Sequence, residues 1–301
     1  MVIVMIAKTI PQNLEINNLA AAPDDEWQRM LRFAGLTEDD KLAMSRSVET
    51  LMRRAVELVV GTYDYLLSVP ETAAILGWET GADEEHLEER RRFFTIWLAR
   101  TLGLDTSDEM AYYLFKAGKY HAAHGPRRIH TPPAYITTAV GMTGAAFASY
   151  MQDAHLSGEI IASAMVGWNK YLSVQLHLMQ RGYEIAREYD DGDFAIPVTL
   201  FGRIRPLVGR RQLEIPVRRG SIVADALRKF FNYYPQTRGE ALERVWHSHE
   251  KPDSAWVEVF PAYIPRGGWR VLLNGRDLAY NGGFTVPLHE NDEISIFPPG
   301  R

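Results

Sequence analysis

His121 is the residue of the chain that is best placed to do chemistry. It falls on the apolar face of a helix that is predicted to begin near Thr106 and to end at the Gly125-Pro126 pair, because apolar residues precede it at three- and four-residue spacing. An imidazole carries a donor and an acceptor, and both cost free energy when they are buried without partners. The ring is therefore either a hydrogen-bonded histidine of the core or a metal ligand.

Cysteine is absent from the 301 residues, which excludes disulfides, thiolate metal sites and a cysteine nucleophile. Any bound metal must then be held by histidine or carboxylate side chains. His124, about one turn after His121, is the rival ligand. A second cluster, HSHE at residues 247–250, has no third ligand at helical spacing, and such alternating histidines are typical of exposed loops.

The helical pattern around His121 extends from Trp27 to about Tyr189. A capping box at Thr37 and Asp40 predicts the start of one long helix, whose apolar stripe includes Met52, Tyr63 and Leu66. Tyr63 is expected on the buried face, and Tyr65 is the alternative if the helix is rotated. A second helix is expected between Glu84 and Gly103, the helix that carries His121 is the third, and Pro132 and Pro133 open another.

After Asp190 the pattern changes to short alternating runs broken by Gly, Pro and Asn. Two runs joined by a Gly-Arg-Arg turn predict a hairpin, Ser221 is expected to cap a helix, and WVEVF, WRVLLNG and EISIF supply further strands. The sequence therefore predicts an α+β multidomain protein, with an all-α domain in residues 1–190 and a second domain in residues 191–301.

Charge and hydropathy limit the partners. The formal net charge is -5, and the basic residues are scattered, which disfavours nucleic acid as a partner. The opening MVIVMIAKTI is shorter than the roughly 20 residues of a membrane span and lacks the basic start of a signal peptide. We expect a soluble, cytoplasmic protein without a membrane partner.

Three segments of the helical half resemble protoglobins and globin-coupled sensors. The run LFKAGKYHAAHGPRRIHTPPAYITTAV is similar to the segment in which the proximal histidine is followed by a glycine and then by a proline-started helix. FAGLTEDD resembles the pre-globin helix and turn of the sensors, and ELVVGTYDYLLSVPET is also similar to this family. The resemblance covers about residues 25–185.

This resemblance implies a globin-like domain that binds haem b (iron protoporphyrin IX), with His121 as the proximal iron ligand and a diatomic gas (O2, CO or NO) on the open face. Tyr63 stands where the family has an aromatic residue that can donate a hydrogen bond to the bound gas. Phe93 and Trp97 are expected either as pocket walls or as ordinary core aromatics. No catalytic residue is expected, although gas chemistry with a reductase partner stays open.

The resemblance has two further implications. Arg127 and Arg128 either pair with the haem propionates or form a solvated basic loop. The family also implies a homodimer through globin helices, in which Gly141 and Gly144 of the segment GMTGAAFASYM allow close approach, although packing within one chain explains these glycines equally well.

The last hundred residues resemble the β-grasp fold of the molybdopterin-synthase small subunit (MoaD) and the ThiS-like sulfur carriers, most specifically in VLLNGRDL and HENDEISIFPPG. This implies a ubiquitin-like domain with a protein partner. Those families end in Gly-Gly, whereas this chain ends Pro299-Gly300-Arg301, which argues against sulfur transfer. The ubiquitin-like domain is then an output domain for the ligand state; the alternative is a sulfur carrier for cofactor synthesis with a regulatory globin domain.

Overall fold

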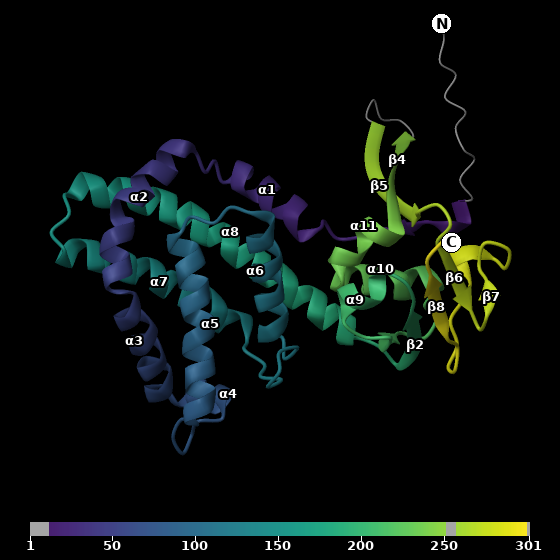
Figure 1. Cartoon of the computed structure of the whole chain (residues 1–301), viewed down its shortest axis with the longest axis horizontal. Helices are drawn as coiled ribbons and strands as arrows, with labels where there is room; N and C mark the ends of the chain where they lie inside the picture. Colours follow the sequence, from purple (N-terminus) through teal and green to yellow (C-terminus); the bar gives the residue numbers. More distant parts are fainter. Residues whose placement is uncertain (1–11, 251–256, 300–301) are drawn as a thin grey trace, which may run out of the picture. The chain divides into compact units, whose positions relative to one another are not determined.

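The computed structural model describes residues 12–250 and 257–299, which form two compact units (Figure 1). One unit contains residues 23–186, and the other combines the segment before residue 23 with the chain from residue 187 onward. Each unit has its own hydrophobic core. The predicted terminal features, MVIVMIAKTI and the final Gly300-Arg301, lie outside the described residues. In the described ranges, no helix is both long and apolar enough to cross a membrane.

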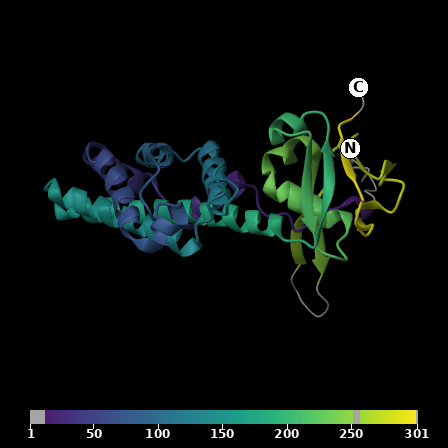
Figure 2. The ribbon, with the colours of Figure 1, turned by 90° about the horizontal axis from the view of Figure 1, so that it is seen from below.

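The helical unit is built from α-helices throughout. In chain order they are α1 (Pro23–Phe33), α2 (Glu38–Arg53), α3 (Ala55–Ser68), α4 (Pro70–Leu76), α5 (Glu84–Leu102), α6 (Asp108–His121), α7 (Pro133–Asp153) and α8 (Gly158–Asp190). Figure 2 shows α8, in teal, as one continuous helix. Prolines begin α4 and α7, where the missing backbone N–H of the first turn is not needed.

The start of α2 confirms the predicted capping box. The hydroxyl of Thr37 accepts a hydrogen bond from the backbone N–H of Asp40 (3.1 Å), and the Asp40 carboxylate accepts one from the N–H of Thr37 (2.9 Å). The prediction of one long helix was wrong, because Arg54 has φ -102° and ψ 4° and separates α2 from α3. The break lets α2 pack on α7 while α3 packs on α5. Met52, which was placed on the buried stripe, is 51% exposed.

Helices α6 and α8 cross at two glycines. A Cβ atom added at Gly118 would lie 1.9 Å from the carbonyl oxygen of Met179, and one added at Gly182 would lie 2.0 Å from that of Phe115. No side chain fits at such distances, so the two backbones touch. Since Gly118 lies one turn before His121, this contact fixes the position of the helix end that carries the histidine.

The second unit contains all of the named strands of the described residues. Its helices and strands are η1 (Gln12–Leu14), β1 (Ile16–Asn17), β2 (Phe194–Leu200), α9 (Ile204–Val208), β3 (Gln212–Val217), α10 (Val223–Tyr233), η2 (Pro235–Thr237), α11 (Arg238–Ala241), β4 (Leu242–Glu250), β5 (Val257–Pro265), β6 (Arg270–Leu273), β7 (Arg276–Asp277), η3 (Gly283–Thr285) and β8 (Ile294–Phe297). They form a five-stranded sheet in the order β3-β2-β8-β6-β7 and a three-stranded sheet in the order β1-β5-β4.

The five-stranded sheet has the β-grasp topology. Strand β2 pairs antiparallel with β3 and parallel with the last strand, β8, which pairs antiparallel with β6. Helix α10 follows the β2–β3 hairpin and buries Phe230 and Phe231 in the core shared with the sheet. The predicted fold class, an all-α region followed by a ubiquitin-like β-grasp region in an α+β protein, is confirmed.

Three details of the second unit differ from the expectations. The segment IRPLV between β2 and β3 forms the short helix α9 rather than part of a strand. Helix α10 is capped by the carboxylate of Asp225, which accepts from the N–H of Ile222 (2.9 Å), and not by Ser221. The HSHE segment, expected in a loop, lies in β4, because this chain stretch pairs residue by residue with β5.

The N-terminal segment groups with the second unit because β1 pairs with β5, with Ile16 opposite Tyr263. Ile16 is buried in the core of that unit. The domain bounds 1–190 and 191–301 themselves stay a prediction.

Candidate functional site

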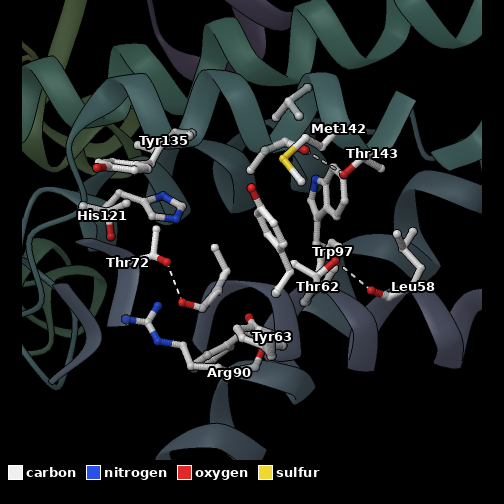
Figure 3. A pocket seen from close by; sticks show the side chains of 18 of the residues that line it. Leu58, Thr62, Tyr63, Thr72, Arg90, Trp97, His121, Tyr135, Met142 and Thr143 are labelled. Atoms are coloured by element: carbon white, nitrogen blue, oxygen red, sulfur yellow. Dashed lines mark hydrogen bonds between the residues drawn. The ribbon is translucent and has the colours of Figure 1, made fainter. Parts of the chain in front are cut away.

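A cavity of about 450 Å³ lies in the helical unit. Five helices, α3 to α7, supply nearly all of its wall, and α8 contributes Met179. The lining is dominated by apolar and aromatic side chains, and the volume is within the range of roughly 300–1,000 Å³ that is typical of sites for small molecules and cofactors. Figure 3 shows His121 at one end of this pocket, and Tyr63 and Trp97 elsewhere on its wall.

His121 is the last residue of α6, and the chain folds back immediately after it. Thr131 donates its backbone N–H to the carbonyl oxygen of His121 (2.7 Å), and Ala122 forms an antiparallel bridge with His130. The imidazole of His130 is in turn 2.6 Å from the hydroxyl of Tyr183 on α8. These contacts tie the end of α6 to the segment that follows it and to α8, and so fix the position of His121 in the pocket wall.

The ring of His121 is buried and incompletely bonded. Its Nδ1 atom has no hydrogen-bond partner among the described residues. His121 keeps some exposed surface where it lines the cavity. Burial, followed by the positive charge of Arg90, lowers the pKa of the ring to about 4. The backbone of Ala117 acts in the opposite direction, because its carbonyl favours the protonated ring. The ring is therefore neutral near pH 7, which is the form that binds metals.

Tyr63 also lines the pocket, but its hydroxyl is already engaged. It donates to the backbone carbonyl of Arg90 (2.8 Å), and its ring packs edge-on against Trp78 and Phe94. Burial raises the pKa of Tyr63 to about 12, so that it stays protonated. Tyr65 lines the pocket as well and is 51% exposed. The structure thus brings both candidate donors to the cavity.

Phe93 and Trp97 of α5 both line the cavity, as expected of wall residues. The indole N–H of Trp97 donates to the side-chain oxygen of Gln175 (2.8 Å), and its ring stacks on Phe94 with the centroids 5.4 Å apart. Trp97 is thereby fixed, whereas Phe93 is 40% exposed.

Arg127 and Arg128 are not among the residues that line the pocket, and neither is the rival ligand His124. Arg127 forms an ion pair with Glu89, and Arg128 is exposed in a turn with φ 52°. The fold-back after α6 therefore brings Thr131, and neither arginine, into the pocket lining. Their proposed contact with haem propionates stays a prediction.

The sequence reasoning missed Arg90, the basic residue that does line the pocket. Its position on α5, four residues before Phe94 and seven before Trp97, places it on the face that these aromatic residues share, and this spacing is the signal that could have found it.

The described residues contain no group of three or more His, Asp or Glu side chains that could hold a metal ion. A metal beside His121 would therefore have to bring most of its other ligands with it, as iron does in a porphyrin. The donor set of one neutral imidazole in an apolar pocket fits such a group.

Comparison with known proteins gives a match for each half of the chain. The protoglobin family model matches residues 24–189. The globin domain of a Geobacter sulfurreducens globin-coupled sensor has 22% identity and a TM-score of 0.42, with 52% of this chain and 96% of that domain covered. The small archaeal modifier protein 1 of Methanosarcina acetivorans has 26% identity and a TM-score of 0.26, with 35% of this chain and 93% of that protein covered.

The corresponding modifier protein of Haloferax volcanii has 19% identity and a TM-score of 0.25, with 35% and 96% of the two chains covered. No curated protein matches this chain. The family model, by contrast, spans more than half of the 301 residues and includes every helix that lines the pocket. The chain therefore belongs to the protoglobin family.

Proposed function

We propose that the helical unit binds haem b through His121 and that the protein senses a diatomic gas rather than acting as an enzyme. The observation that carries this proposal is the neutral, incompletely bonded imidazole of His121 in the wall of an apolar cavity of about 450 Å³. The membership of the chain in the protoglobin family supports the same cofactor.

The pocket residues have separate tasks in this proposal. A neutral His121 offers one ring nitrogen to iron and keeps its proton on the other. When bound, haem supplies an iron atom with an open position for O2, CO or NO. Phe93 and Trp97 keep water out of the pocket. Tyr63 can donate to a bound ligand only after its hydroxyl leaves the Arg90 carbonyl, whereas the hydroxyl of Tyr65 donates to no acceptor among the described residues.

The signal is proposed to leave the pocket through helix α8. The backbone contact at Gly118 and Gly182 couples a displacement of α6 to α8, and α8 continues to Asp190, just before strand β2 of the β-grasp unit. The β-grasp unit would then present the ligand state to a protein partner.

We also propose a homodimer through α7 and α8. Of the two glycines that suggested it, Gly144 packs inside the unit near Leu172, whereas a Cβ at Gly141 would meet nothing within 4 Å. Met142 and Val166 expose apolar surface on these two helices. Light scattering at several concentrations tests the dimer, and a monomer throughout would rule it out.

Haem titration of the full chain tests the proposed cofactor. The wild type is expected to bind one haem with a strong visible band, and His121→Ala is expected to lose or grossly alter that band. His124→Ala is the matched control, since it removes the rival imidazole outside the pocket. A colourless wild type, or the same loss in His124→Ala alone, would overturn the assignment.

A further inference from the structure

Arg90 places a positive charge in the pocket without a compensating carboxylate. Figure 3 shows its guanidinium extending from α5 toward the end of the cavity at which Thr72 and His121 lie. In the part of the chain that the structure describes, Arg90 forms no ion pair. The neighbouring acidic residue, Glu89, is engaged with Arg127 instead.

Among the described residues, the side chain that lies within hydrogen-bond distance of the Arg90 guanidinium, His86, does not satisfy it. The Nε of Arg90 lies 3.1 Å from Nε2 of His86, while the indole N–H of Trp78 lies 3.0 Å from Nδ1 of the same ring. Indole and guanidinium nitrogens only donate, and a neutral imidazole has a single acceptor nitrogen. His86 can therefore accept from one of these two donors and not from both.

Protonation of His86 does not resolve the conflict, because the imidazolium has no acceptor at all. Burial, followed by the charges of Arg90 and Arg127, lowers the pKa of His86 and keeps the ring neutral. Arg90 is half-buried, and its side chain lines a cavity whose wall is dominated by apolar residues.

A guanidinium in such surroundings is costly unless an acceptor reaches it. Unpaired charges lose much of their hydration when they are buried, and burial accordingly acts to lower the pKa of Arg90. The planar, forked guanidinium is suited to bind a small anion or a carboxylate through two N–H groups.

We propose that Arg90 is the anion-binding residue of the pocket and pairs with a negatively charged group of the molecule held beside His121. This inference rests on the proposed haem function. The anionic group has two possible sources with the same chemistry: a small anion that enters the pocket of the ferric protein, or a carboxylate of the haem itself.

Ligand titrations of the full-length ferric haem protein test the inference. Arg90→Met removes the charge but keeps a long side chain, and Arg90→Lys keeps the charge but loses the fork. Arg92→Met is the matched control, because Arg92 is an exposed residue of the same helix. Azide serves as the anionic ligand and imidazole as the neutral one, both followed by visible absorption.

We expect Arg90→Met to weaken azide binding about 10- to 100-fold, the size expected from one hydrogen bond to a charged group. Imidazole binding should be unchanged, Arg90→Lys should lose less, and Arg92→Met should match the wild type. If azide binding is unchanged and haem release to an acceptor apoprotein is faster by a similar factor in Arg90→Met, the partner is the haem carboxylate, which also supports the inference.

Unchanged azide affinity and unchanged haem release in Arg90→Met would overturn the inference while leaving the haem function intact. The same losses in Arg92→Met would overturn it too, because they would show a general effect of charge. A wild-type protein that takes up no haem would instead contradict the proposed function, and this inference with it.

Discussion

The two units of this chain differ in how completely they fill their cores. In the β-grasp unit Phe230 and Phe231 are 0% and 2% exposed and pack edge-to-face with ring centroids 4.9 Å apart. In the helical unit a cavity of about 450 Å³ remains. Buried polar atoms without partners in the described residues also lie there, namely Nε of Arg91, Nδ1 of His121 and Nε2 of Gln175.

Under the proposed function, this difference identifies the helical unit as the one that haem would stabilise. Protein interiors are close-packed, and an empty cavity costs free energy in proportion to its size. The aromatic residues of the β-grasp core pack closely against one another, whereas the proposed haem would fill the cavity of the helical core. Changes to the two cores should therefore have separable effects.

The largest effect is expected from Phe230→Ala in the β-grasp unit. Removing a fully buried phenylalanine should lower the free energy of unfolding of that unit by about 3–5 kcal/mol. Urea unfolding followed by circular dichroism measures the loss, and the haem absorption should stay at its wild-type value. A parallel loss of haem would show that the two cores are not independent.

Removal of haem should destabilise the helical unit alone. At a free haem concentration of about 100 times Kd, binding contributes roughly 2.7 kcal/mol to the folded state. Calorimetry of the haem-free and haem-loaded protein should show two unfolding transitions. Haem should raise the midpoint temperature of the helical unit and leave that of the β-grasp unit unchanged. Equal shifts of both midpoint temperatures, or no shift of either, would contradict the claim that haem stabilises the helical unit alone.

A smaller effect is expected from Gly118→Ala at the crossing of α6 and α8. The added Cβ would lie 1.9 Å from the Met179 carbonyl oxygen, so the helices must separate, at a cost of about 1–3 kcal/mol. Because His121 lies one turn away, the visible spectrum of the haem protein should change as well.

Gly141→Ala is the control for this variant at protein concentrations where the chain is monomeric, since within one chain its Cβ meets nothing within 4 Å. In a helix this exchange should stabilise the protein by roughly 0.5–1 kcal/mol. An unaltered haem spectrum in Gly118→Ala would contradict the role of the glycine crossing in positioning His121.

The smallest effect concerns the pH dependence of the helical unit through His86. Burial, followed by the charges of Arg90 and Arg127, lowers the pKa of His86 below its ordinary value of 6.5. As the pH falls below 6.5, the unfolded chain therefore takes up the proton first, and stability is lost by at most about 1.4 kcal/mol per pH unit.

Urea unfolding between pH 7.5 and 5.5 measures this loss, and His86→Gln should reduce it relative to the wild type. Glu89 and Asp83 act in the opposite direction on His86, so the slope is expected to lie below the limit for one proton. Identical slopes in the two proteins would exclude His86 as the source.

Local signals predicted much of the fold. The capping box at Thr37, the stop at Gly103 and the start of α7 at Pro133 were all found where they were predicted, because each depends on the backbone of a single turn. The break at Arg54 was not predicted, since it results from the packing of α2 and α3 on different partners. The position of HSHE in β4 likewise depends on pairing with β5.

In the candidate site, too, local sequence predicted some features, whereas others depend on tertiary packing. The apolar periodicity of α6 predicted that His121 faces inward, and the structure places it in the pocket wall. The hydrogen bond from Tyr63 to the Arg90 carbonyl and the unpaired charge of Arg90 could not be predicted, because they depend on how α3 and α5 face one another. Arg127 and Arg128 were chosen for their charge, although the fold-back after α6 takes them out of the pocket lining.

The most direct test of the central claim, that the helical core holds haem through the imidazole at residue 121, is the absorption spectrum of the reduced full-length protein with carbon monoxide. Wild type should show a strong, gas-sensitive haem band. His121→Gly should lose or alter it and regain it when free imidazole is added, since imidazole can occupy the space of the missing ring. A variant that keeps the wild-type spectrum without imidazole would contradict the claim.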